Sequence, residues 1–198
     1  MIYDINLIVP FLIILFFVAV LYASVGHGGA SGYIALMTIF GFSVIFLKPT
    51  ALIFNIFVSV ISFLYFKKNK HFNWKLFYPF AIASVPTSFI GGYLKVDESL
   101  FKIILACFIG FSVLKILNVL GRSNKNNKQV NLPLALIFGS AIGLLSGMIG
   151  IGGGIVLSPL IMILGWGSVK ETAAVSALFI FVNSISGLAG FILSGEEL

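Results

Sequence analysis

Charge is scarce in this chain, and its scarcity excludes an ordinary soluble domain. Asp, Glu, Lys and Arg make up 9% of the 198 residues, whereas hydrophobic residues make up 60% and the mean hydropathy is +1.15. A typical soluble domain is about a quarter charged. The composition therefore predicts that lipid rather than water surrounds most of the chain.

Cysteine and histidine are also scarce. Cys107 is the only cysteine and lies in an apolar run, so this chain alone cannot build a disulfide framework or a cysteine-ligated metal site. The two histidines, His27 and His71, are far apart in sequence, and neither has the spacing of a metal ligand. The sequence therefore predicts no metal and no cofactor, and it disfavours a metalloenzyme.

Apolar runs fill most of the sequence. A bilayer core about 30 Å thick needs roughly 20 apolar residues in a helix. The first run has no basic leader of the signal-peptide kind, so we expect it to remain as a membrane span. On this basis the expected spans are 5–24, 30–46, 49–66, 76–94, 100–120, 131–149, 151–165 and 172–194. The predicted fold class is all-α, a polytopic helical membrane protein.

The connectors between these runs indicate an orientation. The net charge is +6, but the basic residues lie in short connectors rather than on one face, so nucleic acid is not an expected partner. Two connectors are basic, one with Lys67, Lys68, Lys70 and Lys75, the other with Arg122, Lys125 and Lys128. The connector between them holds Asp97 and Glu98 beside Lys95. The positive-inside rule places the basic connectors in the cytoplasm of a multi-pass inner-membrane protein.

An internal repeat divides the chain. Residues 26–32 match 150–156 at an offset of 124, and 48–51 match 170–173 at an offset of 122. We therefore expect a first half at 1–120, a cytoplasmic polar linker at 121–130 and a second half at 131–198. If every run crosses the membrane, the halves have opposite orientations and form an inverted repeat. The second and seventh runs are short and begin in glycine clusters, so they are also candidates for half-helices.

The two glycine clusters are the candidate binding elements. Several glycines in a row break a helix, and in hydrocarbon such a break must face protein or a wet cavity. A glycine loop that leads into a helix presents free N–H groups at the positive end of the helix dipole, which suits an anion. Glycines four residues apart also allow close helix packing, and both interpretations stay open. Such pairs are Gly28 with Gly32, Gly139 with Gly143 and Gly147, and Gly150 with Gly154.

Polar residues near the clusters complete the candidate substrate site. His27 is the only titratable side chain in either cluster and could couple proton movement to anion movement. A hydroxyl in a membrane helix more often bonds its own backbone, so each serine has this structural alternative. Lys48 and Lys170 end apolar runs, where snorkelling is the default explanation and attraction of anions the alternative. The candidate substrate-binding residues are Ser24, Gly26, His27, Gly28, Gly29, Ser31, Asn55, Gly150, Gly152, Gly153, Gly154, Ser158 and Asn183.

The two clusters resemble the paired signatures of the sulfite exporter TauE/SafE family. The resemblance rests on YASVGHGGASGY at 22–33 and on GMIGIGGG at 147–154, followed by Ser-Pro-Leu at 158–160. It implies a membrane permease that moves sulfite, sulfoacetate or related organosulfonates with the help of the proton gradient. Family members usually extend one or two spans further. The resemblance therefore also implies that the second half lacks counterparts of 76–94 and 100–120.

The expected function is a membrane transporter, in the export direction, for a small sulfur-containing oxyanion held by backbone amides. Its expected partners are that anion, the lipid bilayer and, as a candidate co-substrate, the proton; the sequence indicates no oligomeric state. A passive anion channel is one alternative. An intramembrane serine hydrolase using Ser24 or Ser31 with His27 is a weaker one, because no orienting acid lies nearby. We therefore expect a protein that is not an enzyme.

Overall fold

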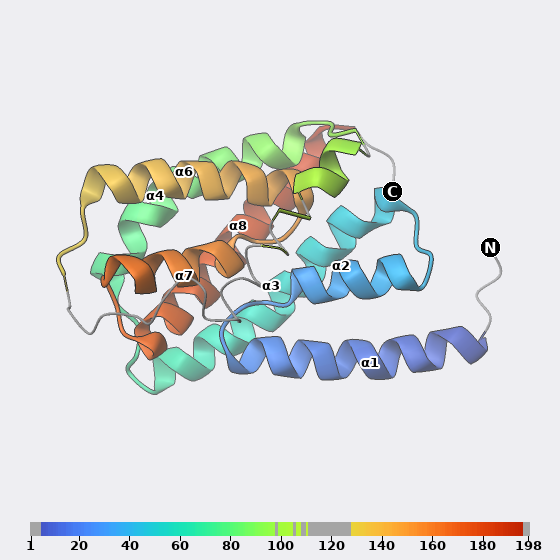
Figure 1. Ribbon diagram of the computed structural model, residues 1–198, viewed down its shortest axis with the longest axis horizontal. Coiled ribbons are helices and arrows are strands. Elements are labelled where there is room, and N and C mark those ends of the chain that lie inside the picture. The colour runs from blue at the N-terminus through green and yellow to red at the C-terminus, as the bar shows by residue number, and fades with distance from the viewer. Residues whose placement is uncertain (1–4, 98, 105, 108–109, 111–127, 196–198) are drawn as a thin grey trace.

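The computed structural model describes residues 5–97, 99–104, 106–107, 110 and 128–195, and this part of the chain is helical with no strand. The predicted all-α class is confirmed. Figure 1 shows the helices side by side along one long axis. Their bounds are α1 Ile5–Ser24, α2 Ala30–Ile39, α3 Val44–Lys68, α4 Trp74–Tyr93, α6 Leu132–Ile149, α7 Gly154–Leu164 and α8 Val169–Leu193.

Four of these helices are long and apolar enough to cross a bilayer. The stretches lie in α1, α3, α6 and α8 and are Leu7–Ser24, Ile45–Lys68, Leu132–Ile149 and Val169–Leu193. The helix α4 is also 20 residues long but carries two internal prolines and several hydroxyl side chains. The predicted span 100–120 lies mostly outside the described residues. The described residues 99–104 are helical.

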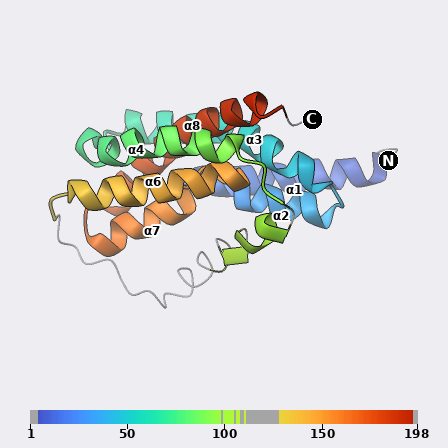
Figure 2. The same ribbon diagram turned by 90° about the horizontal axis from the view of Figure 1, so that it is seen from above.

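The helices α2 and α7 are too short to cross. They contain 10 and 11 residues, so each extends roughly 15 Å at 1.5 Å per residue, about half of a bilayer core. Figure 1 places α2 in the right half and α7 in the left half, with the N-terminal ends of both toward the middle. Figure 2 shows the same division from above. Two half-length helices therefore begin near the centre of the bundle and run in opposite directions.

The predicted boundary between the second and third spans is wrong. We expected it at 47–48, whereas α2 ends at Ile39 and α3 begins at Val44 and continues through Pro49. The turn forms at Gly41, which has a φ of +76°, and the Phe42 amide donates to Met37 O. This left-handed glycine ends the helix. Apolar residues on both sides hide the turn in a hydropathy reading.

Glycines hold α4 against α6. Methyl groups built on Gly139, Gly143 and Gly147 would strike the carbonyl oxygens of Phe80, Ser84 and Ser88, respectively. These three glycines are four residues apart, and so are the three carbonyls, which is the spacing of one helix face. For this glycine series the structure decides in favour of helix packing.

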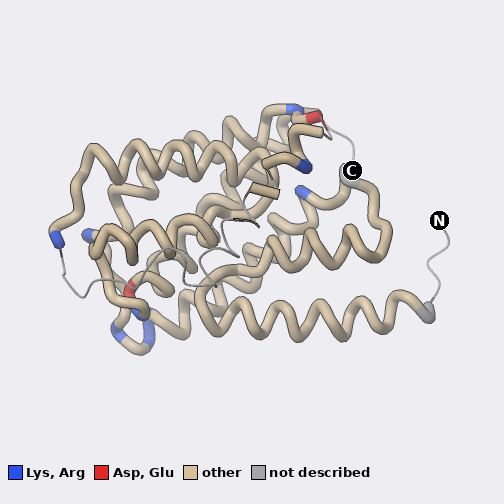
Figure 3. The backbone as a smooth tube through the Cα atoms, in the orientation of Figure 1, with Lys and Arg blue, Asp and Glu red and all other residues tan. Residues whose placement is uncertain are grey.

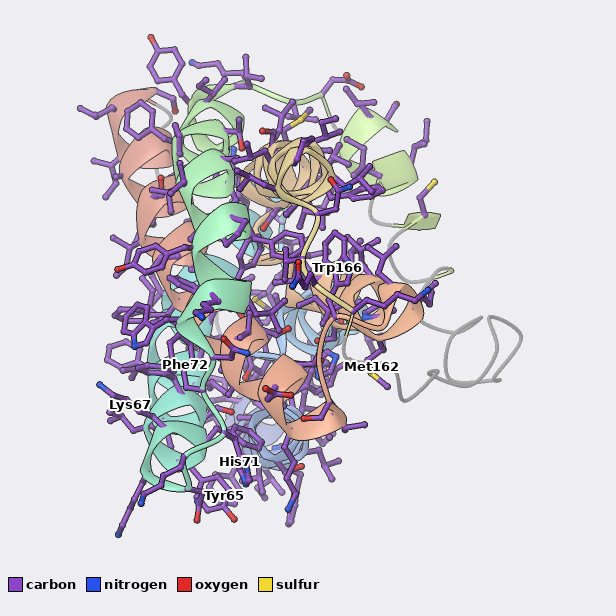
Figure 4. All side chains as sticks on the ribbon, turned by 90° about the vertical axis from the view of Figure 1, so that its left-hand side faces the viewer. Tyr65, Lys67, His71, Phe72, Met162 and Trp166 are labelled. Atoms are coloured by element: carbon purple, nitrogen blue, oxygen red, sulfur yellow. The ribbon has the colours of Figure 1, made fainter. Side chains whose placement is uncertain are left out.

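The ends of the helices carry the charges, as Figure 3 shows. The Asn73 side chain, before α4, donates to Glu171 in the first turn of α8, and the Lys128 amide donates to Gly165 O. The 67–75 connector, the α7–α8 connector and residue 128 therefore lie at one end. Figure 4 looks onto this end, with Lys67, His71, Phe72 and Trp166 in view. The other end of α4 leads to Asp97 at the opposite side.

This arrangement makes a topology test direct. In a Cys107→Ser background, needed because Cys107 is exposed, a cysteine at Asn69 is expected to resist an impermeant thiol reagent applied outside intact cells. A cysteine at Ser99 is expected to react, since both positions are exposed but lie at opposite ends. The reverse labelling would refute the expected orientation. Asn126, in the second basic connector, lies outside the described residues.

Candidate functional site

Each half-helix is preceded by a loop of left-handed glycines. The loops follow α1 and α6, and their glycines with positive φ occur in the same order at an offset of 124: Gly26, Gly28 and Gly29 at +77°, +73° and +107°, then Gly150, Gly152 and Gly153 at +80°, +76° and +79°. Residues with a Cβ rarely adopt this conformation, because it brings Cβ close to the following carbonyl. The requirement for this backbone shape explains the glycines.

The loops present free backbone donors. The residues before α2 and α7, Gly29 and Gly153, supply no side-chain cap. Within the part of the chain that the structure describes, the amides of Gly28, Gly152 and Gly154 make no hydrogen bond. The first N–H groups of a helix have no carbonyl inside that helix and carry the positive end of its dipole. Both loops therefore offer the groups that suit an anion.

The two loops contact the same two side chains. A methyl group on Gly28 would lie 2.9 Å from Asn55 Oδ1 and 2.9 Å from Ile180 Cγ2. One on Gly152 would lie 3.0 Å from Asn55 Nδ2 and 2.7 Å from Ile180 Cγ2. Asn55 comes from α3 and Ile180 from α8. Ser184 Oγ, also from α8, would lie 3.1 Å from the methyl group on Gly152. We call these two loops, with Asn55, Ile180 and Ser184, the central site.

Contacts around the central site are reciprocal. Gly26 of the first loop lies against the backbone of Ala173 in α8. A methyl group added to Gly150 of the second loop would lie 2.8 Å from Lys48 O in α3. Lys48 and Ala173 are each the fifth residue of a 25-residue helix, and Asn55 and Ile180 are each the twelfth. Reciprocal contacts between equivalent positions are typical of a two-fold relation.

This register corrects one alignment made from sequence. We aligned 48–51 with 170–173 at an offset of 122, but counting from the first residues of α3 and α8 gives 125. Lys48 is buried, whereas Lys170 is exposed in the first turn of α8. The two lysines are therefore not equivalent in position.

The Lys48 side chain does not extend to the membrane surface, as expected for snorkelling, but is buried. Its ammonium donates to Gly92 O at 2.8 Å and to Leu94 O at 3.4 Å, at the C-terminal end of α4, and it lies 5.4 Å from the centre of the Phe191 ring. A cation is favourable at the carbonyl end of a helix dipole. Lys48 thus joins α3 to the end of α4 while only 7% exposed.

Several buried polar atoms have no hydrogen-bond partner among the described residues. They are Asn55 Oδ1, Ser146 Oγ, Thr172 Oγ1, Asn183 Oδ1 and Ser184 Oγ. Three of them surround the second loop. Besides Asn55, Ser184 Oγ lies 3.1 Å from a methyl group placed on Gly152, and Ser146 Oγ lies 3.4 Å from one on Gly153. Buried polar atoms are almost always paired, so a cluster of unpaired ones indicates a place for a polar ligand or water.

The serines proposed from sequence lie elsewhere or are already paired. Ser24 is exposed, and its hydroxyl donates to Leu21 O at 2.7 Å in its own helix. The Ser31 hydroxyl is 3.0 Å from Tyr22 Oη. The Ser158 hydroxyl is 2.8 Å from Ser176 Oγ. The structure places none of these three hydroxyls among the unpaired atoms of the central site.

The remaining candidates lie in or near the loops. His27 is half-buried in the first loop, with Nδ1 2.9 Å from Val25 O. Asn183 lies one residue from Ser184 in α8 and donates to Phe179 O at 2.8 Å.

Sequence reasoning missed Ile180 and Tyr33. Ile180 lies between the loops, and Tyr33 Oη donates to Gly28 O at 2.7 Å. Nothing distinguishes either residue from an ordinary membrane-helix side chain in the sequence. Ser184 stands out in the sequence as a polar residue beside Asn183 in the eighth span, although it was not among the candidate binding residues.

A comparison with known protein families gives a match over most of the chain. The family described as Sulfite exporter TauE/SafE matches residues 11–197. This chain belongs to that family. As a TauE/SafE protein it is a multi-pass membrane transporter, in agreement with its apolar helices.

Curated relatives of this TauE/SafE chain carry the same general description. The "Probable membrane transporter protein y4hK" of Sinorhizobium fredii is 38% identical over 189 residues, which cover 92% of this chain and 76% of that protein. The "Probable membrane transporter protein MJ0441" of Methanocaldococcus jannaschii is 29% identical over 205 residues, covering 98% and 76%. No solved structure gives a significant match.

Proposed function

We propose that this TauE/SafE transporter exports a small sulfur-containing oxyanion, such as sulfite or an organosulfonate, and binds it at the central site. The observation that carries the proposal is that both glycine loops, with unpaired amides, meet at the same buried residue, Asn55. The amides, Asn55 and Ser184 are neutral. Neutral donors hold an anion without a fixed counter-charge, which favours its release on the other side.

An inverted repeat would supply the transport cycle. Phe66, near the end of α3, packs with Ala173 and Ala174 at the start of α8, whereas Lys48, near the start of α3, lies over Phe191 at the end of α8. The two helices are therefore antiparallel. Antiparallel equivalent helices, two opposed half-helices and reciprocal contacts support two halves of opposite orientation in the inner membrane, with the site at their interface. Rocking of one half against the other would expose the site to each side in turn.

A proton is the proposed co-substrate, and His27 is its proposed carrier. His27 is the titratable side chain in the loop that contacts Asn55 through Gly28. An imidazole near the site could take up and release a proton in the course of one transport cycle.

Counterflow in liposomes tests the proposal. Vesicles containing the protein and preloaded with unlabelled sulfite are expected to accumulate labelled sulfite transiently, and short sulfonates are expected to compete. Protein-free vesicles are the control. A fixed ratio of proton to anion flux would indicate a carrier, whereas conductive anion flux without counterflow would indicate a channel. Absence of counterflow with sulfite and all short sulfonates would refute the proposed substrate class.

A further inference from the structure

The amide of Asn55 has a defined orientation at the centre of the site. Its Nδ2 donates to Gly150 O at 3.4 Å, on the side of the second loop. Its Oδ1 faces the first loop and has no partner within the described chain, although Asn55 is 0% exposed. Turning the amide over would place its oxygen against Gly150 O. The central site therefore contains, besides its donors, one buried acceptor that needs a donor.

A fully ionised oxyanion cannot satisfy this acceptor. Each oxygen of such an ion is an acceptor, so it pairs with the loop amides but repels Asn55 Oδ1. An unpaired buried acceptor is unfavourable by about as much as a hydrogen bond is worth, or more. A ligand that has anionic oxygens and also a hydroxyl can satisfy both kinds of group.

The charge of the central site also favours a ligand with a single negative charge. The loop amides and the Ser184 hydroxyl around Asn55 are uncharged, as is the imidazole of His27 in its neutral form, and the ammonium of Lys48 is bonded to the carbonyls that end α4. While His27 is neutral, a second negative charge on the ligand would thus enter a buried place with only amide and hydroxyl donors. Burial of charge is strongly unfavourable unless it is paired.

We infer that the central site selects a singly charged oxyanion that carries its own hydrogen-bond donor, and that Asn55 Oδ1 is the acceptor that recognises this donor. The inference rests on the proposed function and specifies its substrate. A protonated oxyanion and a hydroxyalkyl sulfonate share this chemistry. Ser184 Oγ, also unpaired and fully buried, is placed to complete the recognition from α8.

Two stable sulfonates that differ by one hydroxyl provide the probes. Binding of 2-hydroxyethanesulfonate and of ethanesulfonate to the purified full chain is measured by calorimetry. Both carry one negative charge, so the ratio of the two Kd values isolates the donor. The wild-type protein is expected to bind the hydroxylated probe at least about tenfold more tightly, because the other probe leaves Asn55 Oδ1 unpaired.

Asn55→Leu removes the acceptor and keeps the branching at Cγ, and we expect it to bind both probes with equal affinity. Ser62→Ala is the matched control on α3, since Ser62 donates to Ala23 O away from the central site; it is expected to keep the wild-type ratio. Asn55→Ala is a second variant in case the leucine prevents folding.

The outcomes separate the two proposals. Equal affinities of the wild-type protein for both probes would overturn the inference and leave anion binding intact. A preference for the hydroxylated probe that survives in both Asn55 variants would do the same. No binding of either probe, with no competition in sulfite counterflow, would overturn the proposed function instead. Binding of sulfate or another dianion with about twofold higher affinity than the hydroxylated sulfonate would also contradict the inference.

Discussion

Gly28→Ala is expected to abolish substrate binding while the protein still inserts and folds. The added methyl group would lie 2.9 Å from Asn55 Oδ1 and from Ile180 Cγ2, and it would occupy a residue with a φ of +73°. The first loop must then move away from Asn55 and turn its amides. We expect counterflow of sulfite to fall by more than about tenfold, and the stabilisation by millimolar sulfite, which depends on binding to the folded state, to disappear.

Gly41→Ala is the matched control. Gly41 has nearly the same backbone conformation, with a φ of +76°, but an added methyl group meets nothing within 4 Å. The variant should therefore lose only the roughly 1–2 kcal/mol of stability that a left-handed alanine entails, and keep sulfite counterflow. If Gly41→Ala abolished counterflow as well, or if Gly28→Ala retained the sulfite-dependent shift in Tm, the first loop would have no role in binding.

Gly147→Ala is expected to have the opposite signature, a large loss of stability with substrate binding retained. The methyl group would strike Ser88 O, and it would lie 2.8 Å from Gly92 N, so α6 must separate from α4. Overpacking of this kind typically destabilises by about 1–3 kcal/mol. We expect a clearly lower Tm by thermal unfolding in detergent, and a shift on addition of sulfite equal to that of the wild type.

Ile137→Ala provides the control for this variant. Ile137 lies in the same helix but is 63% exposed on its outer face. Its truncation is expected to leave both Tm and the sulfite-dependent shift nearly unchanged. A Gly147→Ala protein with unaltered Tm would contradict the packing role of the α6 glycines.

Hydropathy was sufficient to predict the helical class and the four helices that are long and apolar enough to cross a bilayer, because a bilayer imposes a length and an apolar composition on each helix. The same reading placed the end of the second span too late. The decisive signal there was one residue, Gly41, with apolar neighbours on both sides. A repeat alignment from local identity was likewise three residues out at Lys48 and Lys170, because charge at a helix end is not a positional marker.

The role of the glycines could be narrowed to two alternatives from the sequence, and the structure was needed to choose between them. Their spacing predicted either packing or anion binding, and the structure assigns packing to Gly139, Gly143 and Gly147 on the evidence of their contacts. Gly28 and Gly152 differ because they are left-handed and lie against polar atoms that have no partner. Gly28 and Gly32 have the same four-residue spacing as Gly139 and Gly143 in the sequence, so only the backbone conformation and the neighbours in the structure distinguish the two cases.

By itself, the sequence determined that this protein resides in a membrane and is helical, and it predicted two related glycine clusters between its helices. These properties depend on composition and on local backbone preference, which each segment carries on its own. The tertiary structure decided that the clusters meet at Asn55 and Ile180, residues at equivalent places in two antiparallel helices. It also left Asn55 Oδ1 unpaired between them. A meeting of segments more than 100 residues apart depends on how the helices pack, and no single segment encodes that packing.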